Sequence, residues 1–414
     1  MMDYSIADPG LASPGERKIR WAREHMPVLR RLEEKYRAEK PLSGTVIAAC
    51  LHLEAKTACL LLALQNLGAR VAAAGSNPLS TQDDICAALV KNGVSVFSRH
   101  GMVPEEYFGN IRRTLSVGPA VIVDDGADLA AFLHTEMREF LPGVRGGSEE
   151  TTSGVKRLKA MAAGGILAFP VISVNDAFSK YLFDNRYGTG QSVLDGLLRT
   201  TNLLVAGKSV VIAGYGWCGK GVARRAAGLG ARVIVAEIDP HRAFEALMDG
   251  YEVMTMAEAA PRGDIFLTLT GNTKVIRKEH FGKMKDGAIL GNAGHFDVEI
   301  SKPDLLALSR SVEESRPGIQ TYTMQDGRRL HLLGEGRLVN LACADGHPVE
   351  IMDLSFSLQL ESAIHVSSAR LAPGLYPVPP EIDRAVMEAK LASMDIRLDV
   401  MTPEQEAYMK AWEE

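Results

Sequence analysis

The chain has 414 residues, of which 46% are hydrophobic and 23% are charged. A single hydrophobic core rarely extends beyond roughly 250–300 residues, so the length predicts at least two domains, and the composition excludes a disordered chain. The formal net charge of -5 excludes the basic surface that binds nucleic acid or anionic membranes.

The sequence also shows no feature of a membrane or secreted protein. No run approaches the ~18 consecutive apolar residues of a membrane span, and residues 1–5 lack the basic and apolar regions of a signal peptide. The cysteines are widely spaced and form no Cys-x-x-Cys pair: Cys50, Cys59, Cys86, Cys218 and Cys343. This pattern is typical of reduced thiols, so we expect a cytoplasmic protein without disulfides and without a metal.

Apolar runs alternate with longer helical patterns along the chain. The runs cover residues 45–50, 120–123, 209–213, 232–236 and 264–268. Short buried strands separated by helices are typical of parallel sheets built from βαβ units. We therefore predict an α/β fold.

One short sequence occurs twice. Leu-Gly-Ala-Arg-Val stands at residues 67–71 and again at 229–233, each time between a helical pattern and a strand. The repetition predicts two Rossmann-like, doubly wound parallel-sheet domains, whether or not the two share an ancestor. We expect a proline-rich turn or linker at residues 371–380 and a short helical tail at the C-terminus.

A glycine-rich turn follows the predicted strand at 209–213. Gly214, Gly216 and Gly219 form G-x-G-x-x-G, which allows a tight turn, a close approach of a pyrophosphate and close helix packing. Glu237 ends the next strand, where an acid binds a ribose 2′-hydroxyl and repels a 2′-phosphate. The combination predicts NAD binding, although a glycine-rich turn without a ligand is the alternative.

Polar residues follow three other predicted strands, at 50–56, 124–126 and 292–297. Ligands bind at the carboxyl ends of strands in open parallel sheets, so these segments are candidate site residues. Each also has an ordinary structural explanation, as do Lys180 and Asp184, which could form a surface pair on a helix. Their combination with the predicted NAD turn favours a functional site.

Together these segments resemble the S-adenosyl-L-homocysteine hydrolase family, from about residue 15 to the tail. The motifs that carry the resemblance lie at residues 50–52, 77–83, 124–126, 148–152, 175–185, 214–216, 294–300 and 335–340. The resemblance implies reversible, NAD-dependent hydrolysis of the thioether of S-adenosyl-L-homocysteine to adenosine and L-homocysteine. In that family the ribose 3′-hydroxyl is oxidised, a base removes the C4′ proton, homocysteine leaves, water adds, and the ketone is reduced again.

The resemblance also implies residue roles. The groups expected to act in catalysis are His52, Asp125, Lys180, Asp184 and His295. Substrate binding is expected from Glu54, Lys56, Glu150, Lys180, Asp184, His347 and Met352. NAD binding is expected from Thr151, Thr152, Ser153, Asn185, Gly214, Gly216, Gly219, Glu237, Asn272 and Asn340. Lys180 would lie near the 3′-oxygen, and a base there needs a lowered pKa, which burial would provide.

Two domains that close on the substrate are implied as well. The expected division is a substrate domain at 1–180 and 348–396, an NAD-binding domain at 191–345, hinges near 181–190 and 344–350, and a tail at 397–414.

Two departures from better-known members stand out. Those members carry Thr and then Gln or Glu where this chain has Glu54 and Lys56, beside the purine base. A lysine side chain can only donate hydrogen bonds, so Lys56 suits the oxygen of hypoxanthine. Glu54 could accept a hydrogen bond from the ring N–H of the same base. S-inosyl-L-homocysteine is therefore the alternative substrate. Lys56 and Glu54 could instead pair with each other and leave adenine tolerated.

The second departure is the C-terminus, which ends at Trp412-Glu413-Glu414. Longer relatives continue into a tail that reaches the NAD of a neighbouring subunit. We still expect a homo-oligomer, either a dimer or a tetramer. We do not expect a contact between this C-terminus and the NAD of a neighbouring subunit, and we expect NAD to exchange more easily than in the longer relatives. A dehydrogenase with net redox output and a catalytically silent NAD-binding regulator are the competing functions.

Overall fold

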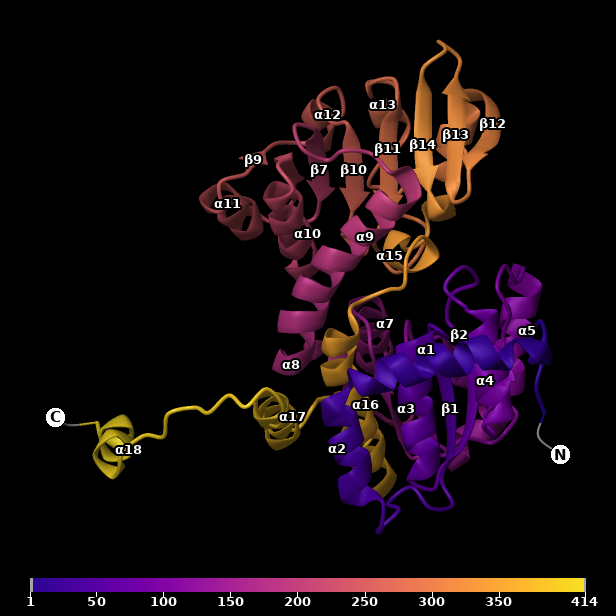
Figure 1. The fold of residues 1–414 in the computed structure, drawn as a ribbon, viewed down its shortest axis with the longest axis vertical. Coiled ribbons are helices and arrows are strands. Elements are labelled where there is room, and N and C mark those ends of the chain that lie inside the picture. The colour runs from indigo at the N-terminus through magenta and orange to yellow at the C-terminus, as the bar shows by residue number, and fades with distance from the viewer. Residues whose placement is uncertain (1–2, 413–414) are drawn as a thin grey trace.

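The protein is described by a computed structural model over residues 3–412, and Figure 1 shows two α/β units with a C-terminal segment that extends away from them. Each unit is built around its own sheet, so the predicted fold class is confirmed. No helix in residues 3–412 is long and apolar enough to cross a membrane.

The first sheet consists of seven parallel strands in the order β15-β6-β5-β4-β1-β2-β3. Their bounds are β1 Val46–Leu51, β2 Arg70–Gly75, β3 Ser95–Phe97, β4 Val121–Asp124, β5 Gly146–Glu149, β6 Pro170–Ser173 and β15 Gly374–Pro377. Strands such as β1 and β4 are apolar on both faces because helices cover both faces of the sheet. These helices are η1 Pro9–Leu11, α1 Ala12–Glu24, α2 Pro27–Tyr36, α3 Ala55–Asn66, α4 Asp83–Lys91, α5 Pro104–Leu115, α6 Asp128–Thr135, η2 Arg138–Gly143, α7 Thr152–Ala163, η3 Val174–Asp176, α16 Val349–Ser368 and α17 Pro380–Ser393.

The second sheet has the order β12-β13-β14-β11-β10-β7-β8-β9. Its strands are β7 Ser209–Ala213, β8 Arg232–Ala236, β9 Glu252–Val253, β10 Ile265–Thr268, β11 Ala288–Asn292, β12 Ser309–Arg316, β13 Ile319–Met324 and β14 Arg329–Leu333. Its helices are α9 Thr189–Thr201, α10 Trp217–Gly228, α11 Pro240–Met248, α12 Met256–Ala259, α13 Lys278–Phe281, α14 Lys302–Ala307, η5 Gly334–Gly336 and α15 Val339–Ala342.

The strand order of each sheet reverses at one point. In the first sheet β1 and β4 are neighbours, and the later strands continue outward from them on opposite sides; in the second sheet β7 and β10 occupy the same position. Side chains that follow such strands converge in a crevice at their carboxyl ends, which is where α/β sheets bind ligands. Each unit therefore presents one such crevice.

Two connections run between the units. The first passes through α8 (Phe178–Lys180) and the π-helical segment η4 (Tyr181–Gly188) into α9, and the second runs from α15 to the start of α16 (Figure 1). Beyond α17 the chain is extended until α18 (Pro403–Lys410), none of whose residues is buried.

The repeated Leu-Gly-Ala-Arg-Val sequence leads into β2 and into β8, with Gly68 at φ +101° and Gly230 at φ +83°. Both glycines follow a helix in the left-handed conformation, and each of the two sheets contains one copy of this helix-to-strand joint, as the repetition predicts.

Two parts of the sheets differ from the prediction. Strands β12 and β13 form an antiparallel hairpin that pairs with β14, so the second sheet is parallel only over its remaining strands. The expected linker at 371–380 contains β15, which pairs in parallel with β6 at the edge of the first sheet. An edge strand tolerates the proline and glycine of this segment, because one side needs no ladder hydrogen bonds.

Candidate functional site

One cavity of about 1000 Å³ joins the two crevices. Its walls come from both units, including the ends of β1 and β4 in the first sheet and of β7 and β8 in the second. The predicted site residues that line it are His52, Glu54, Lys56, Asp125, Glu150, Thr151, Thr152, Ser153, Lys180, Asp184, Asn185, Gly214, Gly216, Glu237, Asn272, His295, Asn340, His347 and Met352. Gly219 lies behind this wall, in the first turn of α10.

The turn after β7 has the geometry of a dinucleotide-binding loop. Gly214 has φ +95°, and a Cβ at Gly219 would overlap the carbonyl oxygen of Gly214. A Cβ at Gly216 would meet only Arg242, at 3.8 Å, so the backbone there is open toward the cavity. The N-terminus of α10 supplies free N–H groups at this point, and these residues therefore fit the pyrophosphate of a dinucleotide.

Glu237 closes the other side of this loop. Its carboxylate accepts hydrogen bonds from the backbone N–H groups of Tyr215 at 2.6 Å and Ile238 at 2.7 Å. The negative charge lies at the cavity wall just after β8, where the ribose of a bound dinucleotide would lie, and it disfavours a 2′-phosphate.

Replacing Gly219 by Ala should remove NAD binding and lower the melting temperature, because the new methyl group has no space beside Gly214. Gly228 provides a matched control in the same helix, since a Cβ there would meet nothing within 4 Å. Gly228→Ala should bind NAD normally and should be as stable as the unmodified chain or slightly more stable. Calorimetric NAD titration and thermal unfolding of both variants check this, and normal NAD binding by Gly219→Ala would contradict it.

Lys180 lies at the centre of a buried polar cluster. Its Nζ atom donates a hydrogen bond to Asn185 Oδ1 at 2.8 Å and lies 3.2 Å from Asp184 Oδ1 and 3.4 Å from Glu150 Oε1. Burial lowers the pKa of Lys180, but the adjacent carboxylates outweigh it and hold the pKa above its ordinary value. The expectation of a lowered lysine pKa is therefore wrong, because burial comes together with two acidic partners.

The two carboxylates differ in their own environments. Burial raises the pKa of Glu150 to about 7, although Lys180 opposes the shift. Burial also acts on Asp184, but Lys180 and His347 outweigh it and hold the pKa of Asp184 below its usual range. At neutral pH the cluster therefore contains a charged lysine, an ionised Asp184 and a glutamate that can gain or lose a proton.

Two residues of α16 support these carboxylates and were not predicted. Ser355 donates to Asp184 Oδ2 at 2.6 Å, and Gln359 donates to Glu150 Oε2 at 2.5 Å. Their spacing is the signal in the sequence, because Ser355 and Gln359 are four residues apart and therefore lie on one face of α16. Buried polar side chains on one helix face need polar partners, which here are the two carboxylates.

A second cluster joins the two units. His52 Nε2 lies 3.3 Å from Asp125 Oδ2, and His295 Nδ1 lies 3.7 Å from Asp125 Oδ1. His52 and Asp125 follow the neighbouring strands β1 and β4, whereas His295 follows β11 of the second sheet. All three are candidate site residues in the sequence, and the structure brings them together.

The protonation states of this cluster follow from burial. Burial lowers the pKa of His52 well below its ordinary value and that of His295 to about 4, so both imidazoles are neutral at pH 7. Burial also raises the pKa of Asp125 to about 7, with Lys180 opposing the shift. Such a carboxyl group can accept or release a proton near neutral pH.

The loop that carries Asp125 is held by Glu149, another residue without a predicted role. Its carboxylate accepts hydrogen bonds from the backbone N–H groups of Gly126 at 2.9 Å, Ala127 at 3.0 Å and Thr151 at 3.0 Å. Gly126 and Ala127 both have positive φ, and these hydrogen bonds stabilise that conformation.

At another end of the cavity Glu54 and Lys56 form a buried ion pair of 2.7 Å. Glu54 also caps α3 by accepting from the backbone N–H groups of Lys56 and Thr57. Lys56 Nζ donates a second hydrogen bond to the carbonyl oxygen of Asp345, at 2.7 Å. Of the two arrangements considered from the sequence, the structure shows the direct pairing.

His347 links the two connections between the units. Its Nδ1 atom lies 3.0 Å from Asp184 Oδ1 in η4, and its Nε2 atom lies 3.2 Å from the hydroxyl of Thr189. Both ring nitrogens are thus engaged on the first connection, while the residue itself belongs to the second. Gly188 provides the space, since a Cβ there would lie 3.0 Å from the imidazole ring.

The remaining predicted cofactor residues surround the junction of the two crevices. Thr151 caps α7, and the hydroxyl of Thr152 donates to Asn175 Oδ1 at 3.1 Å. The buried Oδ1 of Asn340 accepts no hydrogen bond from any residue in the described part of the chain, so it is available to a ligand.

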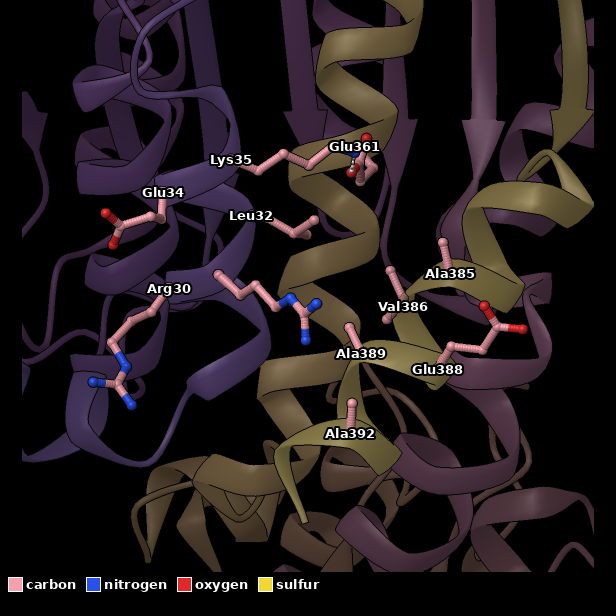
Figure 2. A pocket seen from close by; sticks show the side chains of 11 residues that line it. Arg30, Leu32, Glu34, Lys35, Glu361, Ala385, Val386, Glu388, Ala389 and Ala392 are labelled. Carbon is pink, nitrogen blue, oxygen red and sulfur yellow. Dashed lines mark ion pairs between the residues drawn. The ribbon is translucent and has the colours of Figure 1, made fainter. Parts of the chain in front are cut away.

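A separate groove lies on the outer surface between α2, α16 and α17 (Figure 2). Alanine and valine side chains of α17 line one wall of the groove. Charged side chains of α2 and α16 also line it, among them Arg30, Lys35 and Glu361. Lys35 and Glu361 form an ion pair of 3.8 Å there. None of the predicted site residues lines this groove.

Fold and cavity together define an NAD-dependent enzyme whose acid–base groups converge on a small substrate. Residues 185–346 match the family described as S-adenosyl-L-homocysteine hydrolase, NAD binding domain, and residues 3–141 match S-adenosyl-L-homocysteine hydrolase. The chain is 58% identical over 413 residues to an adenosylhomocysteinase of Thermococcus kodakarensis, which covers 99% of this chain and 98% of the relative. It is 56% identical over 415 residues to an S-inosyl-L-homocysteine hydrolase of Methanopyrus kandleri, covering 100% of this chain and 98% of the relative.

The chain therefore belongs to the S-adenosyl-L-homocysteine hydrolase family. It is a hydrolase that uses NAD, as the resemblance in its motifs implied.

Proposed function

We propose that the enzyme cleaves the thioether of a purine nucleoside–homocysteine conjugate, and that the base it prefers is hypoxanthine. The observation that carries the preference is Lys56, whose ammonium group lines the cavity and makes two hydrogen bonds, to Glu54 and to Asp345. An ammonium group has three N–H donors and no acceptor, so one donor remains. The 6-oxygen of hypoxanthine accepts such a hydrogen bond, whereas the 6-amino group of adenine repels it.

Adenosine is the second candidate, favoured by a different observation. The carboxylate of Glu54 already pairs with Lys56 and accepts hydrogen bonds from two backbone N–H groups. Few of its lone pairs are left to accept a hydrogen bond from the ring N–H of hypoxanthine. Relatives of both names match this chain over nearly its full length.

We infer that the Lys180 cluster binds the ribose. The charged ammonium group donates to the 3′-oxygen, and Asp184 and Glu150 accept from the ribose hydroxyls. Glu150, with a pKa of about 7, is suited to accept the proton that the 3′-hydroxyl releases. NAD, held by the glycine-rich turn and Glu237, supplies the reversible oxidation of the 3′-carbon, which makes the neighbouring C4′ hydrogen acidic.

The second cluster then carries the proton transfers at C4′ and C5′. Asp125 is suited to take the C4′ proton, because its carboxyl group has a pKa of about 7 and faces the cavity. The neutral imidazoles of His52 and His295 can exchange a proton with the departing sulfur and with the incoming water. The site is built from both units, so their closure would exclude bulk water while the 3′-ketone exists.

Replacing Lys56 by Gln should shift the preference toward adenosine, because an amide can both accept and donate a hydrogen bond. We expect the ratio of kcat/KM for inosine over adenosine to fall roughly tenfold or more, equivalent to about 1.4 kcal/mol. The assay runs the synthetic direction with homocysteine and each nucleoside in parallel. Lys91→Gln is the control, since Lys91 is exposed and pairs with Glu16 on the surface.

The same assay on the unmodified enzyme tests the proposal itself. Higher kcat/KM with inosine supports the hypoxanthine preference, higher kcat/KM with adenosine replaces it with the second candidate, and no product from either contradicts thioether chemistry. An unchanged ratio in Lys56→Gln removes Lys56 as the selecting residue.

We also propose the division into a substrate domain at 1–180 and 348–396, an NAD domain at 191–345 and a tail at 397–414. It is supported by the return of the chain to the first sheet, where α16 lies against β5 and β15 pairs with β6. The hinges would lie in the two connections that His347 links. The free cysteines support a reducing compartment, which we propose is the cytoplasm.

We propose that the chain forms a homo-oligomer, a dimer or a tetramer, through its C-terminal segment. This segment extends away from the body (Figure 1), and apolar side chains are exposed along it, including Val400 at 87% and Trp412 at 90%. Apolar side chains in such number are usually covered by a partner. Ending the chain after residue 395 should reduce the particle mass measured by light scattering, and an unchanged mass would contradict this assembly.

A further inference from the structure

The carboxylate of Asp125 has few contacts that fix its direction. Its Oδ1 atom accepts no hydrogen bond from any residue between 3 and 412, and its Oδ2 atom lies 3.3 Å from His52 Nε2. A reacting group must be held to within about 0.5 Å of its productive position. The backbone of the loop that carries Asp125 therefore has to be fixed by other residues.

This loop, residues 125–127, lies between β4 and α6 and is held from two sides. Gly126 and Ala127 have φ values of +109° and +60°, and Glu149 accepts a hydrogen bond from the N–H group of each. On the other side, the carbonyl oxygen of Gly126 accepts a hydrogen bond from Arg157 Nη1 at 2.5 Å. The peptide unit between Gly126 and Ala127 is thus held at both its N–H and its C=O group.

Arg157 is itself anchored. It lies in the second turn of α7, and the same Nη1 atom lies 2.7 Å from Asp128 Oδ1. The hydroxyl of Tyr107 donates to the other oxygen of Asp128 at 2.6 Å. Among the described residues, Tyr107, Asp128 and Arg157 do not line the cavity, so they hold the loop from behind.

The charge of Arg157 suits this position. Burial lowers the pKa of Arg157, but the carboxylates of Asp128, Asp124 and Glu149 outweigh it and raise the pKa above its ordinary value. The guanidinium group therefore stays charged, and a charged donor makes a stronger hydrogen bond to a carbonyl oxygen than a neutral one. It also brings positive charge to a buried acidic region, which lessens the repulsion among these carboxylates.

We propose that Arg157 is a positioning residue, which holds the Gly126 carbonyl group and thereby aims the carboxylate of Asp125 at C4′ of the ribose. Without Arg157, the peptide unit after Gly126 could rotate and carry Asp125 away from C4′. The Lys180 cluster would keep its place, because other segments carry it: α8, η4 and the end of β5. This role rests on the proposed function, in which Asp125 takes the C4′ proton.

Two partial reactions distinguish the ribose site from Asp125. Oxidation at C3′ is followed as the absorbance of enzyme-bound NADH after the NAD-loaded enzyme is mixed with inosine or adenosine, without homocysteine. Removal of the C4′ proton is followed in deuterium oxide. The proton leaves C4′ to the carboxylate, exchanges with solvent and is replaced by a deuteron, which mass spectrometry detects in the recovered nucleoside.

Replacing Arg157 by Met should slow the exchange at C4′ roughly 10–100-fold, because a displacement of about 1 Å is enough for such a loss. The rate of NADH formation should stay nearly unchanged. Arg157→Lys should restore most of the exchange, because one nitrogen atom makes both contacts and an ammonium group can replace it. Arg384→Met is the control, since Arg384 is 80% exposed and pairs with Glu388 on the surface.

Tyr107→Phe is a milder variant that keeps the arginine and removes only the hydroxyl that holds Asp128. It should slow the exchange at C4′ by a smaller factor, again with normal NADH formation. Unchanged exchange in either Arg157→Met or Tyr107→Phe would overturn the proposal, and so would an equal loss of both partial reactions. If the unmodified enzyme forms NADH but exchanges no deuterium at C4′, the proposed function itself is contradicted, and the role of Arg157 falls with it.

Discussion

Replacing Lys180 by Met should lower thioether turnover roughly 10²–10⁴-fold while NAD remains bound. The ammonium group lies within 3.4 Å of both Asp184 and Glu150 and is the cation that faces the ribose hydroxyls in our account. Methionine fills a similar volume but cannot donate to the 3′-oxygen. It also leaves two buried carboxylates without their counter-charge, so Glu150 should bind a proton more readily.

Lys159→Met is the matched control for this variant. Lys159 is 63% exposed and makes only a 3.5 Å ion pair with Asp176, so its loss should change neither turnover nor stability by much. NAD content, measured after denaturation of each purified protein, separates a catalytic effect from loss of the cofactor. Near-normal turnover by Lys180→Met would show that the ribose site is wrongly assigned.

Replacing Asp125 by Asn should have an effect of similar size, again roughly 10²–10⁴-fold, because an amide cannot accept the C4′ proton. In the unmodified enzyme only the ionised carboxylate acts as a base, so kcat/KM should fall as the pH is lowered through about 7, the raised pKa of Asp125. The residual activity of Asp125→Asn should lack this acid limb. Asp326→Asn, at a side chain that is 54% exposed, should keep both the rate and the pH profile.

Stability measurements show whether the loss of activity in Asp125→Asn comes from unfolding. The pKa of Asp125 is raised on folding, so its proton stabilises the native state below the ordinary pKa, and this contribution disappears as the pH rises toward 7. Above pH 7 the native state holds a buried negative charge. Asp125→Asn should therefore have a higher free energy of unfolding than the unmodified enzyme at pH 8, and a lower one would indicate structural damage.

Much of the fold could be predicted because it depends on local sequence patterns. The apolar runs that became β1, β4, β7, β8 and β10 are buried strands, and the glycines at 68 and 230 end helices as expected. Strand order then explains why His52 and Asp125 meet, since β1 and β4 are neighbours with Cys50 opposite Asp124. The convergence of site residues thus follows from topology.

Other features depend on contacts that no local pattern contains. The pKa of Lys180 is raised by two acids, Asp184 and Glu150, and Glu150 lies 30 positions before Lys180 in the sequence. The Glu54–Lys56 pair is completed by the carbonyl oxygen of Asp345, which belongs to the second connection between the units. The strand β15 exists only because β6 provides its partner, and its own sequence is typical of a turn. In each case a distant part of the chain decides the outcome.

Following both product and NADH in one reaction tests most directly whether the enzyme restores its NAD in every catalytic cycle. The purified enzyme, supplied with NAD, homocysteine and either inosine or adenosine, should form the nucleoside thioether through many turnovers, while NADH stays at or below one equivalent per chain. This result is expected if NAD is restored in each cycle. NADH that accumulates in step with consumed nucleoside, without thioether, would contradict thioether chemistry with recycled NAD and indicate a dehydrogenase.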